Sequence, residues 1–476
     1  MAANPDDRIA SLPGWKLREM MVGRQVRPIE VVDLFLDRIH QLDPSLHSFI
    51  TVEPELVRTQ ALQLEDRLAS GAPAGPLFGV PISIKDNLWT KDLRTTAGSL
   101  IYEHHLPSED SIHVHRLRQA DAIIMGKTNL PEFALFPRTR NRLQPECLNP
   151  WDLNRSPGGS SGGAAASVAA LLTAAAIGTD GGGSIRIPAA LCGVFGLHPS
   201  LGRLPHHGSV GSTLMFSSPG PITRDVRDAA VMLQVLARPD PSDPMGRGDE
   251  PPDYLENLEA GVAGMKLLWV RDCGRVEGLN ARVVDLVAEA ATRFRELGAT
   301  LVESDRGLSI ERWIDAFYTI MHADRYASLG QGLYENPACR GMLSDYARDH
   351  FQRARPISGA EYSRALETRF KVVAFFEELI RDHDLILCPT VAGVAPSTAS
   401  PITREPLVAY TFLVNFVGYT AATVPCGLVD GLPMGLQVIG RANCEGQVLR
   451  ACRALERALP FASAIPAMAR LETKSA

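Results

Sequence analysis

Two glycine-rich segments, each containing serine, are the parts of this sequence best suited to chemistry. Gly-Gly-Ser-Ser-Gly-Gly occupies residues 158–163, and Gly-Gly-Gly-Ser-Ile-Arg occupies residues 181–186. Glycine lets backbone N–H groups approach a ligand closely, and a serine among such groups is placed like a nucleophile beside an anion-binding pocket. A lysine, Lys85, stands far upstream. This combination predicts acyl transfer that uses no histidine.

The same glycines raise the alternative of a phosphate-binding loop. Such a loop needs the pattern Gly-x-x-x-x-Gly-Lys-Ser/Thr. Residues 126–128 read Gly-Lys-Thr but lack the first glycine of that pattern, and no lysine follows the glycines of 158–163. The sequence therefore argues against nucleotide binding.

The composition narrows the class of protein. Hydrophobic residues make up 45% and charged residues 21% of the 476 residues, which indicates a globular chain. A net charge of −6 argues against nucleic-acid binding, which needs a basic face. The eight cysteines form no Cys-x-x-Cys pair, which predicts reduced thiols and a cytoplasmic location. The N-terminus shows no signal peptide, and the apolar run 164–177 is too short to span a membrane.

Apolar spacing predicts the elements that must position the candidate groups. Helices are predicted at 30–42, 164–176, 225–237, 281–297 and 359–381. Strands are predicted at 78–84, 122–125, 266–270, 299–303 and 384–388. Strands that alternate with helices predict a layered α/β fold with a largely buried sheet.

Local signals refine these elements. The helix at 164–176 places Ser160 just before a helix N-terminus. Thr223 is the predicted N-cap of the helix at 225–237. Ser358 and Glu361 form a predicted capping box, and the Pro- and Asp-rich stretch 238–253 is predicted to be a surface loop or linker.

Each serine and lysine of the motifs also has a purely structural interpretation. Lys85 can be a strand-end lysine whose ammonium reaches water. Ser160 and Ser161 can cap a helix, and Ser184 can cap a turn.

Charged and histidine pairs leave similar alternatives open. Asp180 and Arg186 form either an ion pair that fixes the glycine-rich turn or a surface pair of little energetic weight. His113 with His115, and His206 with His207, can bind a metal, but no cysteine or carboxylate cluster of ligand spacing accompanies them. The sequence therefore favours solvated histidines.

Taken together, the motifs resemble the amidase signature family. The resemblance rests on an ordered series of segments that spans most of 28–455, including Gly-Val-Pro-Ile-Ser-Ile-Lys-Asp and Gly-Thr-Asp-Gly-Gly-Gly-Ser-Ile-Arg-Ile-Pro-Ala-Ala. The matching segments are 79–86, 126–133, 149–152, 157–163, 178–190, 196–203 and 431–437.

The resemblance implies a catalytic set without metal or organic cofactor. Ser184 is the expected nucleophile, Ser160 on a cis peptide bond relays the proton, and Lys85 is the base. Burial must keep this lysine neutral, because at its reference pKa of about 10.4 it is almost fully protonated at pH 7. The backbone N–H groups of Gly181, Gly182, Gly183 and Ser184 are the expected oxyanion hole, supported by Asp180, Arg186 and Ser161.

Several positions depart from the family pattern. Threonine is usual where Gly181 stands, and lysine is common where His198 stands. The segments 138–148 and 311–357 match no family pattern, so we expect substrate choice to depend on them. Apolar residues near the motifs are candidates for an acyl or aryl pocket, with burial in the core as the alternative; they are Phe133, Leu135, Phe136, Phe216 and Tyr419.

We therefore expect one amidase signature domain over residues 1–476, an α/β/α sandwich with a large mixed, mostly buried central sheet. The expected function is hydrolysis of carboxylic amides, with aryl esters and small carbamates (urethanes) as further substrates. The expected partner is that small molecule alone, with no nucleic acid or membrane, in a monomer or homodimer. Two alternatives remain: the amidase subunit of a glutamine-dependent tRNA amidotransferase, which needs partner subunits and glutamine-binding residues within 311–410, and an inactive homologue that only binds.

Overall fold

The computed structural model describes residues 5–211, 213–241, 243–401, 404–459, 461 and 464–471. Its strands are β1 (Phe49–Thr51), β2 (Pro81–Lys85), β3 (Ile123–Thr128), β4 (Ala175–Asp180), β5 (Phe195–His198), β6 (Ser218–Thr223), β7 (Lys266–Trp269), β8 (Thr300–Glu303), β9 (Leu385–Pro389), β10 (Thr420–Val429) and β11 (Leu432–Gly440). Over these described residues they form one 11-stranded sheet in the order β1-β3-β2-β4-β6-β5-β10-β11-β9-β7-β8.

The sheet is mixed. The β2 strand runs parallel to β3 and β4, and β7 runs parallel to β8 and β9. The central strands β6, β5, β10 and β11 pair antiparallel with their neighbours. The sheet combines strands from N-terminal and C-terminal segments, which agrees with the sequence-based prediction of one domain.

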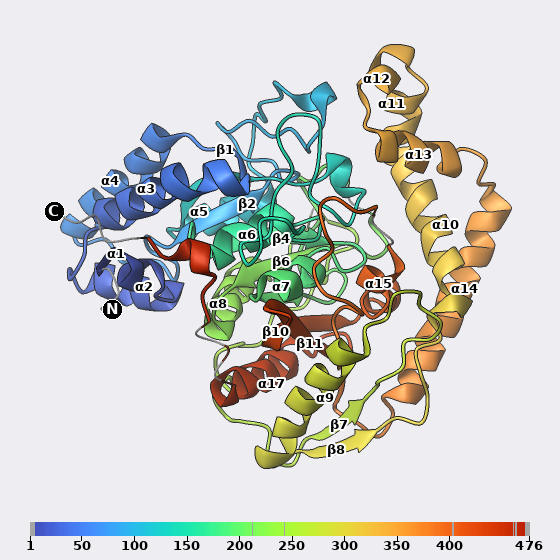
Figure 1. The fold of residues 1–476 in the computed structure, drawn as a ribbon. Helices are drawn as coiled ribbons and strands as arrows, with labels where there is room; N and C mark the ends of the chain where they lie inside the picture. The colour runs from blue at the N-terminus through green and yellow to red at the C-terminus, as the bar shows by residue number, and fades with distance from the viewer. Residues whose placement is uncertain are drawn as a thin grey trace.

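Helices flank the sheet (Figure 1). They are α1 (Pro5–Ala10), α2 (Gly14–Val22), α3 (Pro28–Leu46), α4 (Pro54–Ala69), α5 (Ile112–Gln119), α6 (Gly162–Ala169), α7 (Arg186–Cys192), α8 (Val226–Leu236), α9 (Ala281–Glu296), α10 (Ile314–Arg325), α11 (Gln331–Tyr334), α12 (Pro337–Met342), α13 (Asp345–Ala354), α14 (Gly359–Leu379), α15 (Glu405–Val408), α16 (Phe412–Val417) and α17 (Glu445–Ala458).

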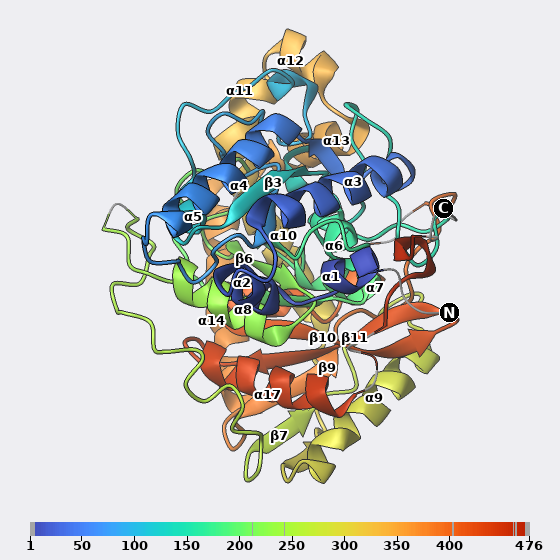
Figure 2. The ribbon, with the colours of Figure 1, turned by 90° about the vertical axis from the view of Figure 1, so that its left-hand side faces the viewer.

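Each face of the sheet carries its own hydrophobic core. Successive strand residues point to opposite faces, so Leu385 and Leu387 of β9 join one core while Ile386 and Cys388 join the other. The first core also contains α8, α9 and α17, and the second contains α10, α14 and α16. In Figure 2, α8 and α17 lie in front of the central strands and α14 lies behind. The predicted α/β/α sandwich is confirmed.

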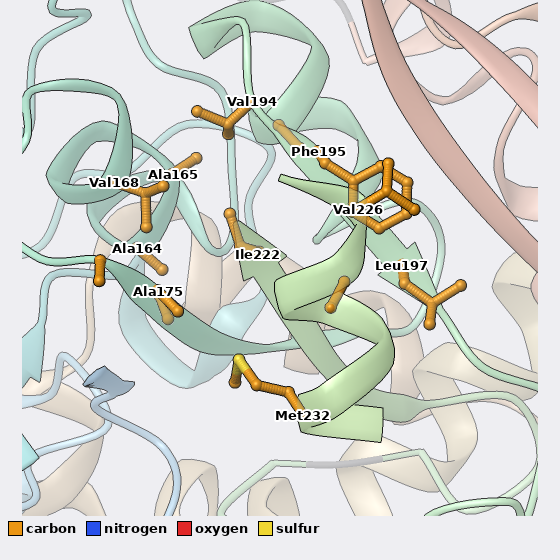
Figure 3. Close-up of a cluster of buried hydrophobic side chains, with 14 of the residues drawn as sticks. Ala164, Ala165, Val168, Ala175, Val194, Phe195, Leu197, Ile222, Val226 and Met232 are labelled. Carbon is orange, nitrogen blue, oxygen red and sulfur yellow. The ribbon is translucent and has the colours of Figure 1, made fainter. Parts of the chain in front are cut away.

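The core around the glycine-rich segments is built from small side chains. Figure 3 shows α6, β4, β5, β6 and α8 meeting there. The side chains labelled in this cluster are Ala164, Ala165, Val168, Ala175, Val194, Phe195, Leu197, Ile222, Val226 and Met232. Small residues let the helix that follows Ser161 approach the sheet closely.

The prediction of one helix over 164–176 is wrong. The α6 helix ends at Ala169, Leu171 has a positive φ of 58°, and Ala175 begins β4. Alanine favours helix, but propensity is a weak prior that tertiary pairing overrides. Here β4 is buried along its whole length between β2 and β6.

The predicted helix ends have mixed outcomes. Asp225, not Thr223, caps α8, because its carboxylate accepts the N–H groups of Arg227 and Asp228. The capping box of Ser358 and Glu361 at α14 is confirmed.

The unmatched segment 311–357 forms helices that extend along one side of the molecule. The α10 helix packs against α14, and the two run together on the right of Figure 1, with α11, α12 and α13 at their upper end. No helix among the described residues is both long and apolar enough to span a bilayer.

Candidate active site

Three motifs meet where parallel strands end. Lys85 is the last residue of β2, and Asp180 is the last residue of the neighbouring strand β4. Ser184 lies in the turn between β4 and α7, and Ser160 lies just before α6. Loops at the carboxyl ends of parallel strands are the usual place for ligand sites in α/β folds.

Four oxygen atoms surround the Lys85 amine. Its Nζ lies 2.7 Å from Ser160 Oγ, 2.9 Å from Ser161 Oγ, 2.9 Å from Thr179 Oγ1 and 3.2 Å from the Thr179 carbonyl oxygen. Lys85 has no exposed surface. A strand-end lysine that reaches water is therefore excluded.

Burial lowers the pKa of Lys85 well below its usual value. The negative charge of Asp180 acts in the opposite direction, and the positive charge of Arg325 adds to the lowering. A neutral amine has a lone pair that can accept a hydrogen bond, which an ammonium lacks. Lys85 is therefore placed to take a proton from Ser160.

A backbone hydrogen bond joins the two serine motifs. The N–H of Ser161 donates to the carbonyl oxygen of Ser184 at 3.0 Å, and the Gly159–Ser160 peptide bond is cis, as the resemblance implied. Ser160 and Ser184 both line the same pocket. The hydrogen bonds of the described residues include none between their two hydroxyls. Catalytic hydrogen bonds are often loose before substrate binds.

Asp180 and Arg186 form a fully buried ion pair, with Arg186 Nε 3.0 Å from Asp180 Oδ2. Burial alone raises the pKa of Asp180, but the charges of Arg186 and His198 and hydrogen bonds from Arg186 and Asn415 outweigh it, so the pKa lies far below its usual value. The alternative of a weak surface pair is wrong. Because Asp180 also accepts N–H groups from the turn, it fixes the backbone around Ser184.

The hydrogen bonds to Asp180 reduce the number of N–H groups that can form the expected oxyanion hole. The N–H of Gly183 donates to Asp180 Oδ1 at 2.6 Å, and the N–H of Gly182 does so at 3.2 Å. Two of the four expected donors are therefore engaged by the carboxylate. Within the described residues, the N–H groups of Gly181 and Ser184 make no hydrogen bond and remain available to an oxyanion.

A cavity of about 70 Å³ opens beside Ser184. Its walls come from the glycine-rich turns, from residues 134–137, from the loop around Thr213, from α10 and from the two ends of α15. The lining residues are Ala134, Leu135, Phe136, Pro137, Ser160, Thr179, Gly181, Gly182, Ser184, Ile187, Gly211, Thr213, Ser217, Phe317, Tyr318, Met321, Arg325, Arg404 and Val408.

Two of the five predicted pocket residues, Leu135 and Phe136, line this cavity. Phe133 instead packs against Phe351 in a core under α13. Phe216 and Tyr419 belong to the core on the α14 face. For these three the prediction is wrong: large apolar side chains near a motif are usually core residues.

The two unmatched segments differ in their contribution. The 311–357 segment supplies Phe317, Tyr318, Met321 and Arg325 to the cavity wall, whereas no residue of 138–148 lines it. The role of 138–148 in substrate choice stays a prediction.

Other lining residues were missed from the sequence. Thr179 directly precedes the recognised Asp180, so its position was a usable signal. Ser217 and Arg404 lie outside every motif, and only the fold brings them to Ser184.

The alternative sites are not formed. Gly126, Lys127 and Thr128 lie in β3 rather than in a phosphate loop. His113 and His206 are buried rather than solvated, and each ring donates a hydrogen bond to a backbone carbonyl, of Pro205 and Ser217 respectively. In the part of the chain that the structure describes, no three histidine, cysteine or acidic side chains gather as metal ligands.

Comparison with known proteins identifies relatives of this arrangement. The family described as Amidase matches residues 30–449. A glutamyl-tRNA(Gln) amidotransferase subunit of Acaryochloris marina is 35% identical, over 94% of this chain and 98% of the relative. Other curated relatives have the same name.

Solved structures give a second comparison. A bacterial aryl acylamidase of the amidase signature family has a TM-score of 0.88 and 32% identity, over 96% of this chain and 98% of that one. The glutamyl-tRNA(Gln) amidotransferase subunit of Thermotoga maritima has a TM-score of 0.78 and 30% identity, over 94% and 95%. Sequence, fold and the Lys85–Ser160–Ser184 arrangement agree: the chain belongs to the amidase signature family of amidases and amidotransferases, which act on carbon–nitrogen bonds other than peptide bonds.

Proposed function

We propose that this protein hydrolyses small carboxylic amides through an acyl-enzyme on Ser184. The observation that carries the proposal is the buried Lys85 amine 2.7 Å from Ser160 Oγ, together with a cavity that both Ser160 and Ser184 line. A base, a relay hydroxyl and a nucleophile are the parts that acyl transfer needs.

The chemistry follows from these positions. Neutral Lys85 takes the proton of Ser160, which takes the proton of Ser184 as its Oγ attacks the amide carbonyl carbon. The oxyanion accepts hydrogen bonds from the N–H groups of Gly181 and Ser184. Each preorganised donor contributes roughly 3 kcal/mol to stabilisation of the transition state. The relay returns the proton to the leaving nitrogen, and the C–N bond breaks. Water then attacks the Ser184 ester through the same relay and releases the acid.

The cavity wall supports an aryl or alkyl group on the substrate. Phe136, Phe317 and Met321 provide apolar surface beside Ser184. Aryl esters and small carbamates present the same carbonyl to the same nucleophile, and their hydrolysis stays part of the proposal.

A second candidate is the amidase subunit of a glutamine-dependent amidotransferase. The curated relatives favour this candidate over the carbamate interpretation. A specific observation also supports it: Arg325 and Arg404, both within 311–410, line the cavity, and an arginine suits the carboxylate of glutamine. This candidate needs partner subunits, whereas the first acts as the chain alone. An inactive binding homologue is disfavoured because Lys85, Ser160 and Ser184 are all present.

The test combines labelling with a substrate screen. A fluorophosphonate probe should form one adduct, at Ser184, and Ser184→Ala should abolish it. The chain alone should then release product from p-nitroanilides, with aryl carbamates and glutamine measured in parallel. Labelling at Ser160 would contradict the nucleophile assignment. Turnover of glutamine, but not of the anilides, would favour the amidotransferase candidate.

A further inference from the structure

The α10 side of the cavity ends in a buried cation, Arg325, which forms no ion pair among the described residues. Arg325 is the last residue of α10, is 6% exposed and lines the cavity with Ser184. A buried charge is costly unless it is paired. Burial lowers the pKa of this guanidinium to about 10, so it remains charged at neutral pH.

The hydrogen bonds of Arg325 leave one nitrogen unused. Its Nε donates to Thr213 Oγ1 at 3.1 Å and its Nη1 to the Phe133 carbonyl oxygen at 3.3 Å. Within the described residues Nη2 makes no bond, although a guanidinium carries five N–H donors. The charge of the adjacent Asp324 acts on Arg325, but its carboxylate accepts the Tyr362 hydroxyl and forms no hydrogen bond or ion pair with the guanidinium among the described residues.

The surroundings hold the guanidinium in place. A Cβ at Gly211 would lie 2.5 Å from Arg325 Nη1, so a larger residue there would displace the guanidinium from its present position. Arg404 lines the same cavity, with its guanidinium carbon 5.6 Å from the centre of the Phe136 ring. It too has no ion pair in the described part. Two cations therefore reach one small cavity, and none of its lining residues in the described part of the chain is acidic.

We propose that Arg325, assisted by Arg404, binds a carboxylate carried by the amide substrate. This inference rests on the proposed function and names the substrate class: amides with a free carboxylate within reach of the scissile bond. The planar fork of arginine matches a carboxylate. The small cavity also favours a single carboxylate over a bulkier anion.

The test uses two pairs of matched amides. On the acyl side, glutaryl-p-nitroanilide is compared with 5-methylhexanoyl-p-nitroanilide, in which an isopropyl group replaces the carboxylate. On the leaving-group side, 4-acetamidobenzoate is compared with N-(4-isopropylphenyl)acetamide. We expect the carboxylate to raise kcat/KM at least about 10-fold in one pair, mainly through KM, and Arg325→Gln to abolish that preference. Arg404→Gln should weaken the preference.

The control is Arg312→Gln. Arg312 lies just before α10, is exposed, stacks on Trp313 and does not line the cavity, so its loss removes one charge without touching the site. This variant should keep the preference. If Arg325→Gln does not fold, competitive inhibition of the wild type decides: glutarate should inhibit and dimethyl glutarate should not.

Two results overturn the inference: no carboxylate preference in either pair, with no inhibition by glutarate, or an undiminished preference in folded Arg325→Gln. Its failure is separable from that of the proposed function. Ser184-dependent turnover of the neutral amides without any carboxylate preference removes only the inference. Turnover that persists in Ser184→Ala removes the proposed function.

Discussion

Lys85 combines full burial with a shell of hydroxyl and carbonyl oxygens, and this environment favours the neutral amine that the proposed mechanism needs. Desolvation disfavours the ammonium, and the hydrogen bonds with Ser161 and Thr179 hold the amine toward Ser160. The carboxylate of Asp180 limits the effect, because its charge favours the ammonium.

Replacement of the three proposed catalytic residues should lower kcat to different extents. Ser184→Ala removes the nucleophile, and Lys85→Ala removes the base, so each should lower kcat by about 10⁴-fold or more. Ser160→Ala should retain more activity, because a water can bridge part of the relay. Because the residues act as a unit, Lys85→Ala/Ser184→Ala should be no worse than the poorer single variant. Wild-type turnover by Lys85→Ala at neutral pH would contradict the mechanism.

The pH–rate profile should rise toward alkaline pH. The lowered pKa of Lys85 means that the active neutral form appears as pH increases through that pKa, so kcat/KM should rise with a midpoint below about 10.4, the reference lysine value. His198, whose pKa burial lowers to about 3, is the matched control, because His198→Asn should leave this limb in place. A limb that disappears in a histidine variant but persists in Lys85→Ala would refute a lysine base.

Gly181 and Ser217 share the space beside the oxyanion turn. A Cβ at position 181 would lie 2.7 Å from Ser217 Oγ, so a larger residue there must displace that hydroxyl or enter the cavity. Gly181→Thr should therefore lower kcat/KM for a bulky aryl amide relative to a small amide by about 10-fold to 200-fold, the range that one methylene-sized space supports.

The comparison variant for this prediction is Gly181→Thr/Ser217→Gly. It removes the crowding hydroxyl and should restore part of the tolerance for bulky amides. The measurement is the ratio of the two kcat/KM values in each variant. An unchanged ratio in Gly181→Thr would mean that specificity depends on α10 and the α15 loop instead.

At the scale of elements, α10 and α13 meet through two histidines, of which His350 is buried and His322 is partly buried. The rings of His322 and His350 are 4.2 Å apart, and neither ring nitrogen of His350 has a hydrogen-bond partner. Burial lowers the pKa of His322 to about 4, and that of His350 well below its usual value, with the charges of Arg325 and Arg404 acting in the same direction on His350. The α10 helix also lines the cavity, so its packing against α13 matters to the site.

This pair should make the fold sensitive to acid. Below about pH 6.5 the unfolded chain binds protons on these histidines while the folded chain does not, so the free energy of unfolding falls as pH falls. His350→Leu should reduce that slope by roughly 1.4 kcal/mol per pH unit. Urea unfolding at pH 8, 6.5 and 5 measures it. The exposed His115→Gln variant is the control, and equal slopes for wild type and His350→Leu would contradict the prediction.

At the scale of the whole molecule, the central hairpin of β10 and β11 joins both halves of the sheet. The β10 strand pairs with β5, whereas β11 pairs with β9. The sequence predicts one domain, and we therefore expect one cooperative thermal transition. Far-UV circular dichroism and loss of activity should coincide, since two-state unfolding gives the same midpoint for every probe. Two separated transitions would indicate two folding units.

Local motifs were enough to predict the family and the fold class and to propose the catalytic residues. Lys85, Ser160 and Ser184 stand in segments whose glycines and neighbouring strand residues are contiguous in the chain, so the candidate groups and the α/β class were readable from pattern alone. Asp180 and Arg186 were recognisable for the same reason, although only burial distinguished their ion pair from a surface pair.

The pocket, in contrast, depends on the tertiary fold. Ser217, Arg325 and Arg404 come from distant segments without a shared pattern, and sheet pairing and helix packing bring them to Ser184. The same packing explains why Ala175 begins β4 rather than continuing a predicted helix, and why Phe133 is a core residue. Local propensity is worth only tenths of a kcal/mol per residue, whereas burial of side chains between layers is worth several times more. Features that depend on such burial therefore could be determined only from the tertiary structure.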